Sequence, residues 1–299
     1  MTAKTIRVRS AESAIKTLER LTKQFVVFRG HREAGWRLQS TLSRHRLTPP
    51  SATTPWAIDA MNDHFLVNLA AISYPLPFDK NDRRGRLEFA RHYGVPSPLI
   101  DMSYSPYIAL FFAFNGVVPS KAKPNDCAAI YCVNLFELAG LWAGLRSRKI
   151  DKSIDGKAFA DTHNKFLYDE DNTFANGYDI GVLKFFGFPA SWNIRMRKQL
   201  GVFIYDTMNH KLNGFDDLEG FIGQNQIPGP EEQPALTKVL IPHKLGRLIL
   251  ERLEIMGISA THLFDNPEGA AMDVFNAYSI GRKTGYAWDI RIGLPKPAR

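Results

Sequence analysis

The order of hydrophobic and polar residues along the chain predicts short strands mixed with amphipathic helices. Apolar residues every three to four positions predict helices, and short runs of β-branched and aromatic residues predict strands. We expect helices after Ser10, from Pro55, over 87–93, from Pro106, over 136–145, from Pro242 and from Pro267 to about Tyr278. We expect strands over 24–29, 36–38, 99–100, 128–133, 194–206 and 238–241. Because strands and helices alternate irregularly, the pattern favours a single α+β domain with short mixed or antiparallel strands and flanking helices.

The limits of these segments rest on turn-forming residues and on local polarity. Gly30 is expected to end the first strand after Arg29. Residues 146–189 are polar and interrupted by glycine, which predicts an insertion with limited regular structure, and 209–232 reads as a loop region. The chain then divides into an N-terminal helix, the main domain and a C-terminal tail, over residues 1–23, 24–278 and 279–299.

Composition narrows the classes of protein and partner. The net charge of +8 and the pI near 9.4 favour acidic partners such as nucleic acid or a phosphate-rich cofactor. The basic residues are spread along the chain, so a mildly basic solvated surface explains them equally well. Cys127 and Cys132 fit neither a zinc pair nor a redox motif, which predicts a structural role and a reducing cytoplasm. We expect no membrane span, no secretory signal and no metal site.

One stretch, residues 87–115, has the pattern of a ligand site. A short helix is followed by a proline-rich extended segment and a brief buried strand. The end of that strand presents Asp101, Ser103 and Tyr104, and Pro106 then opens an apolar helix. Familiar catalytic signatures are missing: the chain has no G-x-S-x-G elbow, P-loop, dinucleotide fingerprint or H-E-x-x-H motif.

Several of these motifs, in order, resemble those of the FRG domain family, named after the tripeptide Phe28-Arg29-Gly30. The resemblance covers WRL at 36–38, STLSR at 40–44, ARHYGVPS at 90–97, LIDMS at 99–103, RMRKQLGVF at 195–203, and LF and PEG at 263–264 and 267–269. It therefore extends over residues 24–278, which we take as an FRG domain containing the insertion.

The motif order is in turn similar to that of ADP-ribosyltransferases, which implies an ADP-ribosyltransferase-like fold and NAD as substrate. In those enzymes an Arg or His ends the first strand, a Ser/Thr strand follows, and a later strand carries a Glu/Gln-x-Glu pair. Arg29, Ser103 and Gln199 match by residue type. Alternation along a strand would place Gln199 and Gly201 on one face, so a glycine occupies the position of the catalytic glutamate. Glu268 or Asp101 would have to supply the carboxylate.

The resemblance implies two sets of site residues. The catalytic candidates are Arg29, Gln199, Glu268 and Asp101. The cofactor-binding candidates are Arg29, Gly30, His92, Tyr93, Ser103 and Tyr104, where the arginine fork would hold pyrophosphate and the tyrosines would stack on nicotinamide.

Each candidate also has a purely structural interpretation. Arg29 can form a salt bridge at the strand end, and Asp101 and Ser103 can cap the following helix. His92 and Tyr93 can serve as a helix-end charge and as core packing. Gln199 can bridge buried backbone, and Glu268 can be a helix N-terminal charge.

The function we expect is that of a cytoplasmic toxin or antiphage defence effector. It would transfer ADP-ribose from NAD to nucleic acid or protein, with an antitoxin or chaperone as a further partner. Two alternatives stay open. One is a metal-independent ribonuclease-type toxin that uses His92, Tyr93 and Arg29. The other is a non-catalytic nucleotide- or nucleic-acid-binding module, which Gly201 favours.

Overall fold

A computed structural model of the protein describes residues 4–22, 25–44, 55–147, 154–168, 183–187, 192–208, 217–225 and 234–280. Within these ranges one mixed sheet of seven strands runs in the order β1-β7-β4-β2-β3-β6-β5. The strands are β1 (Lys4–Arg7), β2 (Val26–His31), β3 (Leu99–Ser103), β4 (Cys127–Asn134), β5 (Leu183–Phe186), β6 (Gly201–Asp206) and β7 (Leu236–Pro242). Only β1 and β7 pair in parallel; the other pairings in this sheet are antiparallel. The predicted α+β class is confirmed.

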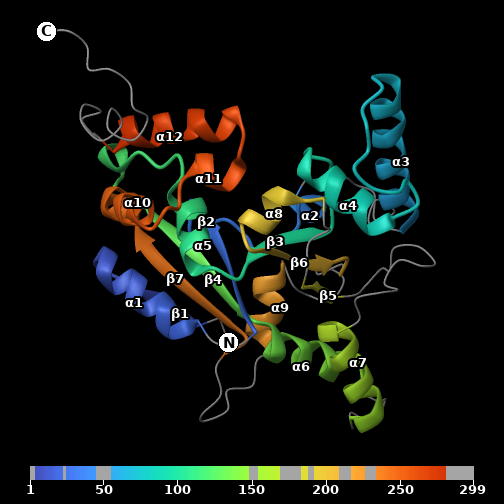
Figure 1. Ribbon diagram of the computed structural model, residues 1–299. Helices are drawn as coiled ribbons and strands as arrows, with labels where there is room; N and C mark the ends of the chain where they lie inside the picture. The colour runs from blue at the N-terminus through green and yellow to red at the C-terminus, as the bar shows by residue number, and fades with distance from the viewer. Residues whose placement is uncertain are drawn as a thin grey trace, which may run out of the picture.

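Helices cover both faces of the sheet (Figure 1). They are α1 (Ala11–Leu21), α2 (Thr41–Arg44), α3 (Pro55–Ala71), α4 (Arg83–His92), α5 (Pro106–Phe114), α6 (Leu135–Arg146), α7 (Gly156–Tyr168), α8 (Ile194–Lys198), α9 (Leu218–Asn225), α10 (Gly246–Ile255), α11 (Ala260–Phe264) and α12 (Pro267–Ser279), with 3-10 turns η2 (Pro119–Lys121) and η3 (His243–Leu245). None of the helices in the described ranges is long and apolar enough to span a bilayer.

The central strand β4 is buried on both faces, and its alternating side chains divide the core in two. Ile130 and Cys132 pack with α1, α5 and α10, whereas Tyr131 and Val133 pack with α6 and α9. Cys127 and Cys132 are buried free thiols, which confirms their structural role. A third apolar cluster joins α2, α3 and α4 to β3 and β6.

Local signals placed several element ends correctly. The Ser10 side chain accepts a hydrogen bond from the Ser13 amide at 3.0 Å and caps α1. Pro106 occupies the first turn of α5, behind the Ser105 cap. Gly94, with φ of 90°, follows the end of α4 in the left-handed conformation.

Gly30 does not break the first strand, contrary to the prediction. Strand β2 continues through Gly30 to His31. Helix α5 crosses the strand at Gly30 at very close range. A Cβ at this position would lie 1.9 Å from the Ala109 carbonyl oxygen and 2.8 Å from the Ala113 amide nitrogen. The glycine therefore permits a backbone approach that no other residue allows.

The predicted strand over 194–206 is two elements. Asn193 caps α8 by accepting from the Met196 amide at 3.1 Å, so the basic segment is helical. Leu200 then takes a positive φ of 46° and turns the chain into β6. Gln199 precedes the strand, and the alternation that paired it with Gly201 does not exist.

Four further expectations are corrected in the described ranges. Residues 36–38 form no strand, and Pro242 ends β7 instead of opening a helix. The segment 209–232 contains α9. The segment 146–189 contains α7 and the edge strand β5, which pairs with β6. Most of the remaining residues of these two segments, and the tail beyond residue 280, lie outside the described residues.

Candidate functional site

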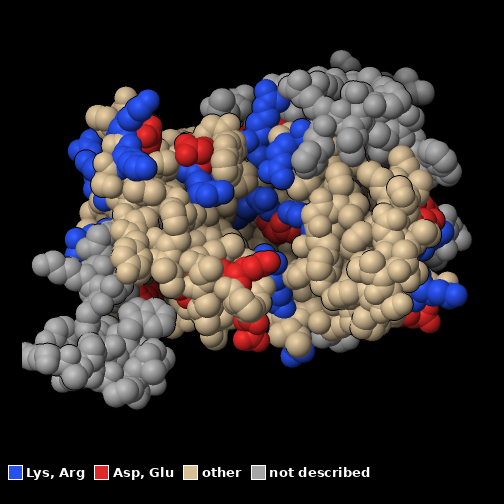
Figure 2. Space-filling view, turned by 90° about the horizontal axis from the view of Figure 1, so that it is seen from above, with Lys and Arg blue, Asp and Glu red and all other residues tan. Residues whose placement is uncertain are grey.

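A cleft of about 880 Å³ opens between α12 on one side and α4 on the other. Figure 2 shows it from above as a hollow in which Lys and Arg side chains surround an acidic group. Six of the predicted site residues line it: Arg29, Gly30, His92, Asp101, Ser103 and Gln199. They come from four separate parts of the chain, so the fold brings together what the motifs had suggested.

A partly buried ion-pair cluster forms the inner wall of the cleft. Arg29 donates from Nη1 to the Asp101 carbonyl oxygen at 2.5 Å, and the same nitrogen lies 3.5 Å from the Asp101 carboxylate. Arg91 donates to that carboxylate as well. Burial raises the pKa of Asp101, but Arg91 and Arg29 outweigh it and hold the pKa below its ordinary value. Arg29 thus forms the salt bridge of its structural interpretation, inside the cleft.

His31 completes the inner wall. Its Nε2 accepts a hydrogen bond from Arg29 Nε at 2.8 Å, which requires a neutral ring. Burial and the Arg29 charge lower the pKa of His31 to about 3. The imidazole therefore holds Arg29 in place across the neutral pH range.

Ser103 and Gln199 use their polar groups to join elements. The Ser103 hydroxyl donates to the Gln199 carbonyl oxygen at 2.8 Å and accepts from the Ser105 amide at 3.0 Å. The side-chain Nε2 of Gln199 donates to the Leu263 carbonyl oxygen at 3.3 Å. These bonds tie β3, α8 and α11 together, which matches the predicted bridging role of Gln199.

Gly201 has no space for a carboxylate. It lies opposite Ser103 in the sheet, and a Cβ there would be 2.2 Å from the Met196 methyl and 3.0 Å from the Met196 carbonyl oxygen. The preceding Gln199 also lies outside the strand. The correspondence with a Glu/Gln-x-Glu strand is therefore wrong at both of its positions.

Arg195 is a cleft cation that has no ion pair among the described residues. Its guanidinium lies 4.3 Å from the Phe264 ring centroid, and within the described ranges no carboxylate comes into salt-bridge distance. Burial lowers the pKa of Arg195, while the charges of Asp101 and Glu268 oppose that change. The group stays protonated at neutral pH, so it offers its donors to the cleft.

His92 lies beside Arg195 on the cleft wall and is half-buried. Burial and the Arg195 charge lower the pKa of His92, against the opposing charges of Asp101 and Glu268. The charge of Glu268 acts on the pKa of both His92 and Arg195, so this carboxylate lies near the cleft. Glu268 itself is exposed in the first turn of α12, and it is not among the lining residues.

The two predicted stacking tyrosines lie away from the cleft lining. The Tyr93 hydroxyl is 2.8 Å from the Tyr74 hydroxyl, and its ring packs 4.8 Å from Phe89 on α4. Tyr104 is half-exposed, and its ring centroid is 6.5 Å from that of Phe185. Tyr93 is 51% exposed, so its ring packs on the surface of α4 and the core-packing interpretation is wrong.

The sequence interpretation missed several cleft residues, among them His31, Trp36, Arg91 and Arg195. Arg91 and Arg195 stand inside motifs that had already been singled out, and their basic character was the available signal. His31 was missed because the strand was expected to end before it. No group of three His, Cys, Asp or Glu side chains that suits a metal ion occurs among the described residues.

Fold and site together define an α+β protein with an arginine-rich cleft lined by the inner strands β2 and β3 of a mixed sheet. Residues 24–122 match the family model of the FRG domain, so the chain carries an FRG domain. The match includes Arg29, Arg91, His92, Asp101 and Ser103, whereas the later motifs lie beyond it. No curated protein and no solved structure matches the chain.

Proposed function

We propose that the cleft binds NAD and that the protein is an ADP-ribosyltransferase-like toxin or defence effector of the cytoplasm. The observation that carries this proposal is the charge of the cleft. Six lining residues are arginines and only Glu88 and Asp101 are carboxylates. Glu88 accepts from Arg84 at 3.0 Å and Asp101 is already paired, so the remaining positive charge favours an anionic ligand.

The size and the donors of the cleft fit a dinucleotide. Its volume of about 880 Å³ is within the range of small-molecule sites, roughly 300–1,000 Å³. The Arg91 Nε atom is buried with no hydrogen-bond partner, and Arg195 has no ion pair among the described residues. A guanidinium fork binds phosphate oxygens in a bidentate manner, so Arg195 is the proposed pyrophosphate contact, whereas Arg91 is already held by Asp101.

The proposed reaction is a substitution at the nicotinamide-bound ribose carbon. The bond from this carbon to the nicotinamide nitrogen breaks, and nicotinamide leaves with the bonding electrons. An oxygen or nitrogen of the acceptor forms the new bond and loses its proton. Because Asp101 is neutralised by two arginines, Glu268 is the proposed carboxylate that stabilises the positive charge developing on the ribose.

Calorimetric titration with NAD tests the binding step. Arg195→Ala should weaken binding by about 10- to 100-fold, the effect of losing charge-assisted hydrogen bonds. Arg195→Lys should recover only part of it, because the fork is lost. Arg197→Ala is the matched control: Arg197 is exposed on the same helix and does not line the cleft, so binding should be unchanged. Equal affinity in Arg195→Ala and wild type would refute the proposal.

Incubation with labelled NAD, RNA, DNA and cell lysate tests the transfer step. Transferred label and free nicotinamide are expected from wild type, and both should be lost in Glu268→Gln. Arrest of a bacterial host on expression, relieved by the same variant, is expected of a toxin. An antitoxin or chaperone would then be recovered bound to the inactive protein.

A non-catalytic nucleotide-binding module is the second candidate, and one observation favours it. Of the two candidate carboxylates, Asp101 is paired with Arg29 and Arg91, and Glu268 does not line the cleft. NAD binding that depends on Arg195, with no nicotinamide released, would select this candidate. The ribonuclease alternative loses support because the Tyr93 hydroxyl is next to Tyr74, away from the cleft lining.

A further inference from the structure

The mouth of the cleft carries an indole that the fold leaves open to solvent. Trp36 lines the cleft and is 45% exposed. The Arg32 guanidinium lies 5.7 Å from its ring centroid, and the His31 ring lies edge-on at 6.0 Å between centroids. An aromatic face beside a guanidinium, at the entrance to a basic cleft, is suited to binding a ligand that has a planar ring next to an anionic group. The ring would stack on the aromatic face, and the guanidinium would contact the anionic group.

The backbone that carries Trp36 is firmly held. The Ala34 amide donates to the Cys127 carbonyl oxygen at 2.8 Å, which ties the loop to β4. His243 Nε2 lies 2.6 Å from the Arg32 carbonyl oxygen, and the Tyr131 hydroxyl lies 2.8 Å from the Trp36 carbonyl oxygen. The exposed ring is thus presented from a fixed loop, which lowers the entropy lost when a ligand is bound.

The surroundings of the ring are basic. Arg32, Arg37 and Arg44 line this part of the cleft and are exposed. Arg37 is 3.9 Å from the buried carboxylate of Asp217, so the positive charge available in this part of the cleft comes mainly from Arg32 and Arg44. Exposed aromatic rings alternating with arginines are the recognition pattern for the bases and phosphates of single strands.

We propose that Trp36 and Arg32 form a base-stacking platform for single-stranded nucleic acid at the mouth of the cleft. An unpaired base lies on the indole face, and the adjoining phosphates lie against Arg32 and Arg44. A duplex does not fit this role, because its bases are already stacked. The assignment of this strand as the ADP-ribose acceptor rests on the proposed function, whereas its binding to the platform does not.

Fluorescence anisotropy with labelled 12-residue oligo(dT) and oligo(U), in the absence of NAD, tests the platform. Trp36→Ala should weaken binding by about 5- to 100-fold, the range for loss of one base–aromatic stack. Trp36→Phe should keep most of the affinity, because it retains a ring. In a salt titration Arg32→Ala should reduce the slope of log K against log salt by about 0.7, whereas Trp36→Ala should leave that slope unchanged.

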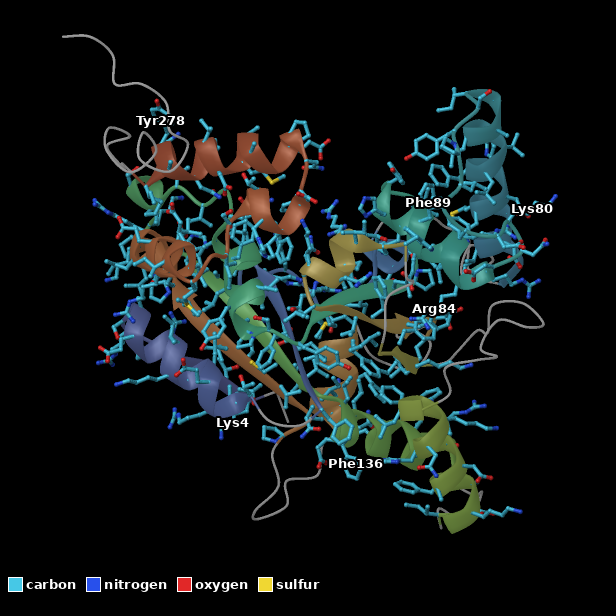
Figure 3. The ribbon with its side chains drawn as sticks, viewed as in Figure 1. Lys4, Lys80, Arg84, Phe89, Phe136 and Tyr278 are labelled. Atoms are coloured by element: carbon cyan, nitrogen blue, oxygen red, sulfur yellow. The ribbon has the colours of Figure 1, made fainter. Side chains whose placement is uncertain are left out.

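The control removes an aromatic ring of similar exposure elsewhere. Phe136 on α6 is 50% exposed and lies far from the cleft, at the lower end of the molecule in Figure 3. Phe136→Ala should bind the oligonucleotides like wild type. Each variant is checked by thermal unfolding, so that loss of binding is compared only between folded proteins.

Three results would overturn the platform. They are absence of oligonucleotide binding by wild type, equal affinity of Trp36→Ala and wild type, and tighter binding of a duplex than of the single strands. Transfer of label to protein alone would also exclude the strand as acceptor. NAD binding is measured separately, so failure of the NAD proposal would leave the oligonucleotide result intact.

Discussion

The arginines on the inner wall of the cleft and those at its rim differ in what surrounds them. Arg29 and Arg91 converge on Asp101, and Arg29 is further held by His31. Arg195 and Arg32 instead rest against aromatic rings and have no ion pair among the described residues. The inner pair is therefore part of the fold's internal electrostatics, and the rim pair has donors to offer a ligand.

The surroundings of each arginine distinguish residues that shape the cleft from residues that can bind a ligand, and the residue type alone does not make this distinction. Arg29 was the favoured ligand-binding residue because it stands at a strand end within a motif. Its fixed contacts make it a positioning residue that shapes the cleft. The following four changes test the contrast, in order of decreasing effect.

Gly30→Ala should have the largest effect, because the added Cβ would collide with the α5 backbone at Ala109. Overpacking of this kind destabilises by about 3 kcal/mol or more, since a backbone cannot rotate away. Gly140→Ala is the matched control: no atom lies within 4 Å of its added Cβ, so this helix position should gain about 0.5–1 kcal/mol. Urea unfolding measures both, and similar stabilities of the two variants would contradict the close approach.

Arg91→Ala and Arg195→Ala should separate stability from binding. Loss of Arg91 removes a charged partner of Asp101, whose side chain is 36% exposed, and should cost about 2 kcal/mol after screening by solvent. Loss of Arg195 removes only a contact with Phe264 and should cost about 1 kcal/mol. A greater destabilisation by Arg195→Ala would remove the distinction between wall and rim.

Acid should destabilise the protein through His31. Its pKa of about 3 in the folded state is below its value of 6.5 in the unfolded chain, so only the unfolded chain takes up the proton as pH falls below 6.5. Stability is fully present above pH 6.5 and declines toward pH 3. Between pH 7 and pH 5 the wild type should lose about 2 kcal/mol more than His31→Gln. Parallel losses in urea titrations would show that His31 is not held neutral.

Tyr93→Phe should have the smallest effect. It removes one half-exposed hydroxyl contact with Tyr74 and should change the free energy of unfolding by less than about 0.5 kcal/mol. Because Tyr93 does not line the cleft, the affinity for NAD should not change. A tenfold loss of NAD affinity would restore Tyr93 as a ligand contact.

Much of the fold followed from local signals. Ser10, Pro106 and Gly94 set element ends through interactions that reach only a few residues, so the sequence displays them directly. Gly30 misled because its conformation is decided by α5, which is remote in the sequence. The strand over 194–206 was wrong for a different reason: a cap at Asn193 and a turn at Leu200 are local, but the apolar pattern of the segment suits a strand.

The sequence predicted which motifs lie together in the site, but it did not predict the contacts between their residues. Arg29, Asp101, Ser103 and Gln199 do line one cleft, as the order of the motifs implied. Which hydrogen bonds they make depends on pairing across the sheet, and those pairings cannot be read from spacing. Arg195 was overlooked because α8 was taken for a strand. A strand directs this side chain differently from the helix that the structure has.

The parallel pairing of β1 with β7 also bears on how the protein is made. Thr5 pairs with Lys238, so this sheet edge cannot close until the chain has been synthesised beyond residue 238. Helix α12, which contributes Met272 and Phe275 to the cleft, emerges later still. A nascent chain that ends before α12 thus has no complete cleft, and a ligand cannot make all of its contacts until that helix has been synthesised.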